Sequence, residues 1–170
     1  MGFDDRDAFI EAFKPTGTGL STNDLQCLID RKADLFQEII RDGISAYPGV
    51  VDLIRNIRIS RTPLAISSGA LRSDIAPILE TLGIADCFDV IVTAEDVPRS
   101  KPDPEVFLLA ASKLNIPPGQ CLVVEDADAG VEAAINAGMK CLAVGSAREN
   151  PKAHLGANNL NEITVERLLN

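Results

Sequence analysis

Two adjacent carboxylates follow a run of apolar residues in the second half of the chain. Residues 121–124 read Cys-Leu-Val-Val, Glu125 and Asp126 come next, and the stretch after Gly130 has the apolar spacing of a helix. This pattern predicts a buried strand, an acidic tip and a helix. The carboxyl ends of strands in an open parallel sheet face the ligand crevice. Mg²⁺ would hold two such carboxylates together, whereas a plain strand end and helix N-cap would also favour acids here.

Two further turns carry groups that suit a phosphate. Ser68 and Gly69 follow the apolar run 64–66 and offer a hydroxyl and free backbone N–H groups at a strand-to-helix turn. Lys101 lies in a loop stiffened by two prolines, which can aim its ammonium at a phosphoryl oxygen. Taken singly, Ser68 could be a helix cap and Lys101 a solvated surface charge. A hydroxyl, a lysine and an acid pair on successive strand ends together predict a phosphate site.

Composition narrows the class of protein. The 170 residues are 46% hydrophobic and carry a net charge of −9, which allows one good core and a small appendage. The negative charge and the lack of a Lys/Arg cluster argue against binding to nucleic acid or to a membrane surface. No apolar run approaches the ~20 residues that span a bilayer, and no signal-peptide pattern is present, so we expect a cytoplasmic protein.

The cysteines and the histidine do not form a recognisable site. Cys27, Cys87, Cys121 and Cys141 are scattered without a C-x-x-C pair. Cys121 and Cys141 each open an apolar strand-like run, which suits small buried hydrophobes better than disulfides or zinc ligands. His154 is the sole histidine and lies in a polar tail with no obvious partner. Catalysis by a Ser-His-Asp or Cys-His arrangement is therefore not expected.

The pattern of elements changes near residue 47. Residues 1–46 are predicted to be wholly helical, with one helix in 1–14 and a second that begins at the capping signature 21–24 and continues to Gly43. Strands are then predicted at 63–68, 89–94, 121–124 and 141–144, with helices between them. Strict alternation predicts parallel strands with right-handed crossovers, the doubly wound α/β class. We therefore expect a partial helical cap at 1–46 and an α/β core at 47–170.

The three polar turns together resemble motifs of the haloacid dehalogenase-like (HAD) hydrolase superfamily. The matching stretches are Leu-Ala-Ile-Ser-Ser-Gly at 64–69, Lys-Pro-Asp-Pro at 101–104 and Val-Glu-Asp at 124–126. The closest similarity is to the β-phosphoglucomutase and phosphatase branch, whose core is Rossmann-like. The resemblance implies that Ser68 and the Gly69 backbone bind the transferring phosphoryl group and that Lys101 neutralises it. It also implies that Asp126 ligates Mg²⁺ and that Glu125 supports the same site.

The acid pair favours Mg²⁺-dependent phosphoryl chemistry over the metal-free dehalogenases of the superfamily. The resemblance therefore implies a phosphatase or phosphomutase-like enzyme that acts on a small phosphorylated metabolite.

The start of the chain departs from that family. The family opens with an apolar strand and an Asp-x-Asp motif, whose first aspartate is the nucleophile and whose second is the acid/base. Asp5-Arg6-Asp7 matches those letters, but only four residues precede it and a helical pattern follows. Residues 2–9 instead resemble the family's cap helix and loop. Arg6 is then a candidate contact to a distal substrate group, with a solvated arginine at a helix start as the alternative. Asp5 as nucleophile is the less favoured interpretation.

A core that lacks the family's first, central strand should have a gap in its sheet and unpaired backbone groups. We expect such a chain to be less stable than its relatives and to form homo-oligomers or exchange strands. Without a carboxylate nucleophile, covalent phosphoryl transfer should be lost or strongly reduced. The alternative function is a non-catalytic remnant that serves as a phosphate-binding or assembly module.

Overall fold

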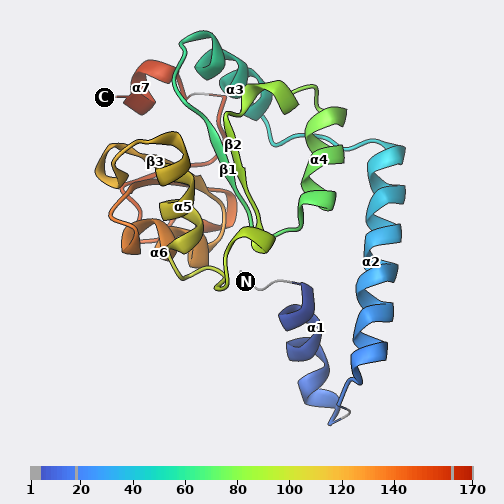
Figure 1. The fold of residues 1–170 in the computed structure, drawn as a ribbon. Helices are drawn as coiled ribbons and strands as arrows, with labels where there is room; N and C mark the ends of the chain where they lie inside the picture. Colours follow the sequence, from blue (N-terminus) through green and yellow to red (C-terminus); the bar gives the residue numbers. More distant parts are fainter. Residues whose placement is uncertain (1–4, 18, 162, 170) are drawn as a thin grey trace.

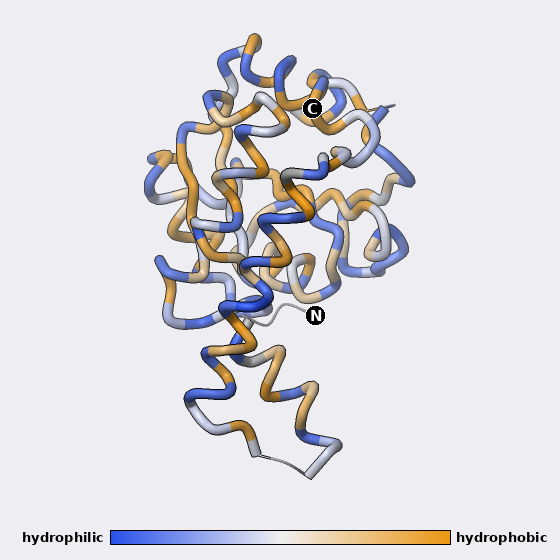
Figure 2. Tube along the Cα trace, turned by 90° about the vertical axis from the view of Figure 1, so that its right-hand side faces the viewer, coloured by the Kyte–Doolittle hydropathy of each residue, from blue (hydrophilic) through white to orange (hydrophobic). Residues whose placement is uncertain are grey.

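The computed structural model describes residues 5–17, 19–161 and 163–169. It begins with two helices, α1 (Asp5–Phe13) and α2 (Thr22–Asp42), which pack on each other and project from the α/β part (Figures 1 and 2). Helix α2 starts at a capping box, because the Ser21 hydroxyl accepts from the Asp24 N–H and the Asp24 carboxylate accepts from the Ser21 N–H. The two predicted helices are confirmed, apart from residues 1–4 of the first, which lie outside the described ranges. The division of the chain at residue 46 stays a prediction.

The α/β part alternates helices with parallel strands, as predicted from the apolar spacing. The elements are α3 (Val50–Ile59), β1 (Ala65–Ser67), α4 (Arg72–Thr81), β2 (Val90–Val92), α5 (Glu105–Leu114), β3 (Leu122–Glu125), α6 (Asp128–Asn136), β4 (Lys140–Val144), β5 (Leu155–Ala157) and α7 (Val165–Leu169). Strand β5 was not predicted. Its Leu-Gly-Ala sequence is too short for a strand pattern, and pairing with β4 places it at the sheet edge.

The strands form two separate hydrogen-bonded groups. In one, β1 pairs with β2 in a register that joins Ile66 to Ile91. In the other, β3 pairs with β4, joining Val124 to Leu142, and β4 pairs with β5. No hydrogen-bonded ladder joins β1 to β3 among the described residues. The parallel sheet is therefore interrupted between these two strands.

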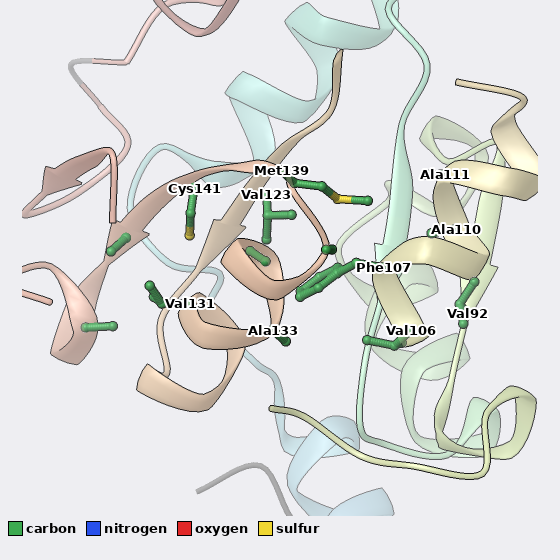
Figure 3. Packing of buried hydrophobic residues seen from close by; sticks show 14 residues of the cluster. Val92, Val106, Phe107, Ala110, Ala111, Val123, Val131, Ala133, Met139 and Cys141 are labelled. Carbon is green, nitrogen blue, oxygen red and sulfur yellow. The ribbon is translucent and has the colours of Figure 1, made fainter. Parts of the chain in front are cut away.

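Helices cover both faces of the strands, but the two faces differ. Helix α5 packs on β1 and β2, and α6 packs on β3 and β4. One continuous hydrophobic cluster lies under both helices, with Phe107 and Val123 at its centre (Figure 3). The opposite face has two clusters, one around Leu53 of α3 and one around Ile75 of α4. The core is thus continuous beneath α5 and α6 and divided on the other face.

None of the helices in the described ranges has the length and the apolar character needed to cross a membrane.

Candidate active site

The turn after β1 presents a hydroxyl at the carboxyl end of the strands. The Ser68 N–H donates to the Val92 carbonyl oxygen at 2.9 Å, and the Ser68 Oγ accepts from the Ala70 N–H at 3.1 Å. Because the hydroxyl accepts in that bond, its own hydrogen can be donated to a ligand. Gly69 is exposed beside it. Ser68 is not the cap of α4, since that helix has Leu71 at its N-cap.

The turn after β2 holds the Ser68 turn in place. The Ala94 N–H donates to the Ala70 carbonyl at 3.2 Å, and the Arg72 guanidinium lies 3.1 Å from an Asp96 oxygen. Asp96 also accepts from the N–H and the hydroxyl of Thr93. The backbone hydrogen bond from Thr93 is the main reason that the pKa of Asp96 is below its ordinary value. Sequence reasoning missed these positioning residues, although Thr93-x-x-Asp96 is a capping pattern.

Lys101 is held among groups from three elements. Its ammonium pairs with the Glu125 carboxylate, donates to the Ser67 carbonyl oxygen at 3.2 Å and lies 4.7 Å from the centre of the Phe107 ring. The side chain is only 13% exposed, so the alternative of a solvated surface charge is wrong. Lys101 joins the ends of β1 and β3 at the interruption in the sheet.

Glu125 points inward beneath the first turn of α6. One carboxylate oxygen pairs with Lys101, and the other accepts from the N–H groups of Asp126 and Ala127 at 3.2 and 3.4 Å. The residue is 8% exposed, and its carboxyl group packs directly on Gly130. Helix α6 has Ala127 as its N-cap without a side-chain cap, so these acids do not form the helix cap considered as an alternative. Glu125 positions Lys101 and orders this turn.

Asp126 is the open carboxylate of the pair. Asp126 is exposed and directly follows the last residue of β3. Its backbone carbonyl oxygen accepts from the Ser146 hydroxyl at 2.7 Å. No group of three or more His, Cys, Asp or Glu side chains in the described part of the chain is arranged to hold a metal ion. Mg²⁺ is commonly held by one or two carboxylates with waters and substrate phosphate oxygens. The exposed Asp126 carboxylate is the type of oxygen ligand that Mg²⁺ takes, and its role as a metal ligand stays a prediction.

The remaining sequence candidates lie on α1. Arg6 is exposed on that helix, and none of the contacts between described residues joins it to Ser68, Lys101 or Asp126. The side chains of Asp5 and Asp7 lie outside the described part of the structure. The roles considered for Arg6 and Asp5 stay predictions.

His154 has a partner that sequence reasoning missed. Its ring Nδ1 accepts from the Cys141 backbone N–H at 3.2 Å, and the backbone N–H of His154 donates to the Cys141 carbonyl oxygen at 2.9 Å. The expectation of an unpartnered histidine is wrong because β5 brings residue 154 beside β4. Burial raises the pKa of the Cys141 thiol to about 11, and the nearby Glu125 carboxylate adds to the rise. Cys141 is accordingly a core residue, as predicted.

A cavity of about 590 Å³ lies at the opposite, amino-terminal end of β1 and β2. Pro63, Asp89 and Arg58 are among the residues that line it, and Arg58 pairs with Asp89 at 3.0 Å. The backbone N–H of Leu64, which donates to Asp89, is the main cause of a lowered Asp89 pKa. This cavity is remote from the strand ends that carry Ser68, Lys101 and Asp126, so it is not part of the candidate site.

Comparison with known proteins decides the family. Residues 1–144 match the family model of the haloacid dehalogenase-like hydrolases. The chain belongs to this family. Within it, the chain falls in the branch of β-phosphoglucomutases and phosphatases. The resemblance drawn from the three polar turns is confirmed.

Named relatives of this HAD hydrolase include phosphatases. The fructose-1-phosphate phosphatase YqaB of Escherichia coli is 34% identical over 121 residues, which are 71% of this chain and 63% of that protein. The bifunctional riboflavin kinase/FMN phosphatase of Arabidopsis thaliana is 34% identical over 152 residues, 85% of this chain and 40% of that protein. A crystal structure of β-phosphoglucomutase from Clostridium difficile superposes with a TM-score of 0.83 at 28% identity, covering 97% of this chain and 75% of that one.

This chain spans 63% of the length of YqaB and 40% of the length of the riboflavin kinase/FMN phosphatase. Its strands and helices match the solved HAD structure over nearly the whole of its own length.

Proposed function

We propose that this HAD hydrolase binds the phosphoryl group of a small phosphorylated metabolite and takes part in its Mg²⁺-dependent hydrolysis. The observation that carries the proposal is the placement of Lys101. Its buried ammonium lies between the end of β1, which leads to Ser68, and the end of β3, which leads to Asp126. A hydroxyl donor, a fixed cation and an open carboxylate thus lie at neighbouring strand ends, an arrangement suited to an anionic ligand with a divalent cation.

Each group has a distinct role in the proposal. The Ser68 hydroxyl and the Gly69 N–H donate to phosphoryl oxygens, and Lys101 balances the charge that they carry. Glu125 fixes the direction of the Lys101 ammonium. Asp126 holds Mg²⁺, which supplies charge neutralisation at the phosphoryl oxygens.

Sugar phosphates are the substrate class that we favour, because one relative is named as a fructose-1-phosphate phosphatase. A phosphomutase role is the finer alternative, since the matched crystal structure is named a β-phosphoglucomutase.

Turnover by residues 1–170 alone should be slow. Glu125 and Asp126 are the carboxylates found at this site in the described ranges, and both oxygens of Glu125 are already engaged. Asp126 is assigned to the metal in this proposal, which leaves no described carboxylate to form an aspartyl-phosphate. This observation also supports the second candidate function, a module that binds phosphate without turning it over.

The test measures phosphate binding and p-nitrophenyl phosphate hydrolysis separately, each with Mg²⁺ and with EDTA. Lys101→Met should weaken phosphate binding by about tenfold or more, since a charge-assisted contact is worth at least about 1.4 kcal/mol. Lys140→Met, at an exposed lysine on β4, is the matched control and should bind as the parent chain does. Equal phosphate affinity in both variants would refute the proposed site. Binding without hydrolysis would favour the second candidate.

A further inference from the structure

The cavity at the amino-terminal end of β1 and β2 has the size of a small-molecule site. Its volume is about 590 Å³, within the range of pockets that hold such ligands. The end of α3, the segment before β1, the start of β2 and the end of α5 bound it, and among the described residues that line it none belongs to β3. The cavity is therefore separate both from the candidate active site and from the interruption in the sheet.

Cations outnumber acids around this cavity, although the chain as a whole has a net charge of −9. Arg58, Arg61 and Lys113 line it, against a single described carboxylate, that of Asp89. Both oxygens of that carboxylate are engaged, because one lies 3.0 Å from the Arg58 guanidinium and the other accepts from the Leu64 N–H at 3.0 Å. Asp89 therefore balances Arg58 and leaves the charges of Arg61 and Lys113.

Neither of these two remaining cations has a close acidic partner of its own. Lys113 lies 3.6 Å from an oxygen of Asp96, which is longer than a hydrogen bond, and Asp96 also pairs with the Arg72 guanidinium at 3.1 Å. Within residues 5–17, 19–161 and 163–169, no ion pair or side-chain hydrogen bond involves Arg61. The described acids thus leave the cavity with positive charge to spare, which favours an anionic ligand.

Arg61 occupies a backbone position that glycine usually takes. Helix α3 ends in a Schellman motif, in which the Arg61 N–H donates to the Arg58 carbonyl and the Thr62 N–H donates to the Ile57 carbonyl. This motif puts Arg61 in the left-handed region, at φ +60°, which is strained for a residue with a Cβ. Helix α4 ends in the same way with Gly83, at φ +63°. The arginine is therefore the costlier residue for ending α3.

Helix polarity explains only part of this positive charge. Arg58 and Lys113 lie in the last turns of α3 and α5, where cations offset the helix dipole. Arg61 lies beyond the last turn of α3, and a glycine there would end the helix with less strain. Strained residues persist where their side chains serve a ligand, so the guanidinium of Arg61 is the group that needs a functional explanation.

Apolar side chains form the rest of the lining. Pro63, Val90 and Leu114 contribute it, and Val90 and Leu114 are half-buried. Small-molecule sites typically combine such apolar walls with a few charged groups that orient the ligand. The cavity therefore suits a ligand that has an anionic head and an apolar body.

We infer that this cavity is a second ligand site, which binds a small dianion of the phosphate or phosphonate type with an apolar body. Arg61 and Lys113 hold the head, since a guanidinium fork matches phosphoryl oxygens and two cations balance two negative charges. The body lies on Pro63, Val90 and Leu114. The inference does not depend on the proposed function, because the cavity shares no residue with the candidate active site.

The test titrates the full chain with phenylphosphonate and follows the backbone amide shifts by NMR. Phenylphosphonate carries a dianionic head on an apolar ring, and it has no ester bond to hydrolyse. The amides of Val90 and Leu114 report on the cavity, and those of Ser68 and Gly69 report separately on the candidate active site. Val90 and Leu114 should shift to saturation. Benzoate, which has the same ring and one charge, should bind there about tenfold more weakly or less, because it leaves one cation unpaired.

A matched pair of variants locates the anion. Arg61→Gln keeps the Cβ and removes the charge, and it should weaken phenylphosphonate binding at Val90 and Leu114 by about tenfold or more. Arg55→Gln makes the same change at an exposed arginine of α3 that does not line the cavity, and it should bind as the parent chain does. Arg61→Gly should also lose binding but melt at a higher temperature than the parent chain, because glycine adopts the left-handed conformation without strain.

Three results would overturn the inference. The first is the absence of shifts at Val90 and Leu114, whether or not Ser68 and Gly69 respond. The second is equal affinity of the Arg61→Gln and Arg55→Gln variants, or equal affinity for benzoate and phenylphosphonate. The third is an Arg61→Gly chain that melts below the parent, because the arginine would then stabilise the chain instead of serving a ligand. A loss of phosphate binding at Ser68 and Gly69 alone would count against the proposed function and not against this site.

Discussion

Replacing Gly130 with alanine should displace the Glu125 carboxylate. A Cβ built on Gly130 would overlap the carboxyl carbon and both oxygens of Glu125, far inside the 3.0 Å that real Cβ atoms respect. Glu125 would then have to leave the first turn of α6. It would lose the Lys101 pair and its hydrogen bonds from the N–H groups of residues 126 and 127.

The expected loss in the free energy of unfolding follows from these contacts. Breaking one side of a buried ion pair costs about 3 to 5 kcal/mol, and Glu125 and Lys101 are only 8% and 13% exposed. Alanine is favoured over glycine in a helix by about 1 kcal/mol, which offsets part of that loss. The net destabilisation from Gly130→Ala should be about 2 to 4 kcal/mol.

Urea unfolding followed by circular dichroism measures this difference, with Gly119→Ala as the control. A Cβ at Gly119 meets no atom within 4 Å, so that variant should stay within about 0.5 kcal/mol of the parent chain. In a Glu125→Ala background the clash is absent, and Gly130→Ala should then be neutral or stabilising. If Gly130→Ala is as stable as Gly119→Ala, or equally harmful with and without the Glu125 side chain, the reasoning is wrong.

Three further outcomes test the surrounding structure. Asp96→Asn should be less stable than the parent chain near neutral pH, because the backbone hydrogen bond from Thr93 lowers the pKa of Asp96 in the folded protein. The stabilisation from the Asp96 carboxylate is lost as pH falls through that folded pKa, so the difference in the free energy of unfolding should shrink when urea unfolding is repeated from about pH 7 to about pH 3. Iodoacetamide at about pH 8 should label the exposed Cys27 quickly and the buried Cys141 only after unfolding, and mass mapping of the labelled peptides would show this order. The reason is that burial raises the pKa of the Cys141 thiol to about 11. Gly49→Ala should lower the melting temperature measurably, because Gly49 has φ +83° and its Cβ would lie 2.5 Å from a backbone nitrogen of the C-terminal segment. Normal melting of Gly49→Ala, or early labelling of Cys141, would contradict the packing described.

The features that could be predicted from the sequence are those that depend on neighbouring residues. The Ser21 and Asp24 capping box, the helix faces and the strand predicted at 121–124 each follow from local spacing, and the structure confirms them, with the strand one residue later at Leu122–Glu125. The family follows as well, because its three motifs lie within short continuous stretches. What local spacing supplies is the identity and order of the groups at the strand ends.

The features that could not be predicted depend on residues distant in sequence. The burial of Lys101 comes from Phe107 and from Glu125, which only the assembled strands bring to it. The partner of His154 is a backbone group of β4, and β5 forms only because β4 offers an edge. The Glu125 carboxylate turns inward because Gly130 has no Cβ and leaves room for it. Two adjacent acids in a sequence do not show which of them will be buried in this way.

The interruption between β1 and β3 also bears on how the chain folds. With no ladder across it in the described ranges, β1 pairs only with β2, the next strand in sequence, and β3 only with β4. Loop closure for each ladder is therefore short, which favours rapid and separate formation of the two strand groups. Docking through the cluster beneath α5 and α6 then couples them. Each half is expected to behave as its own cooperative unit in native-state hydrogen exchange, with the two halves opening at different free energies.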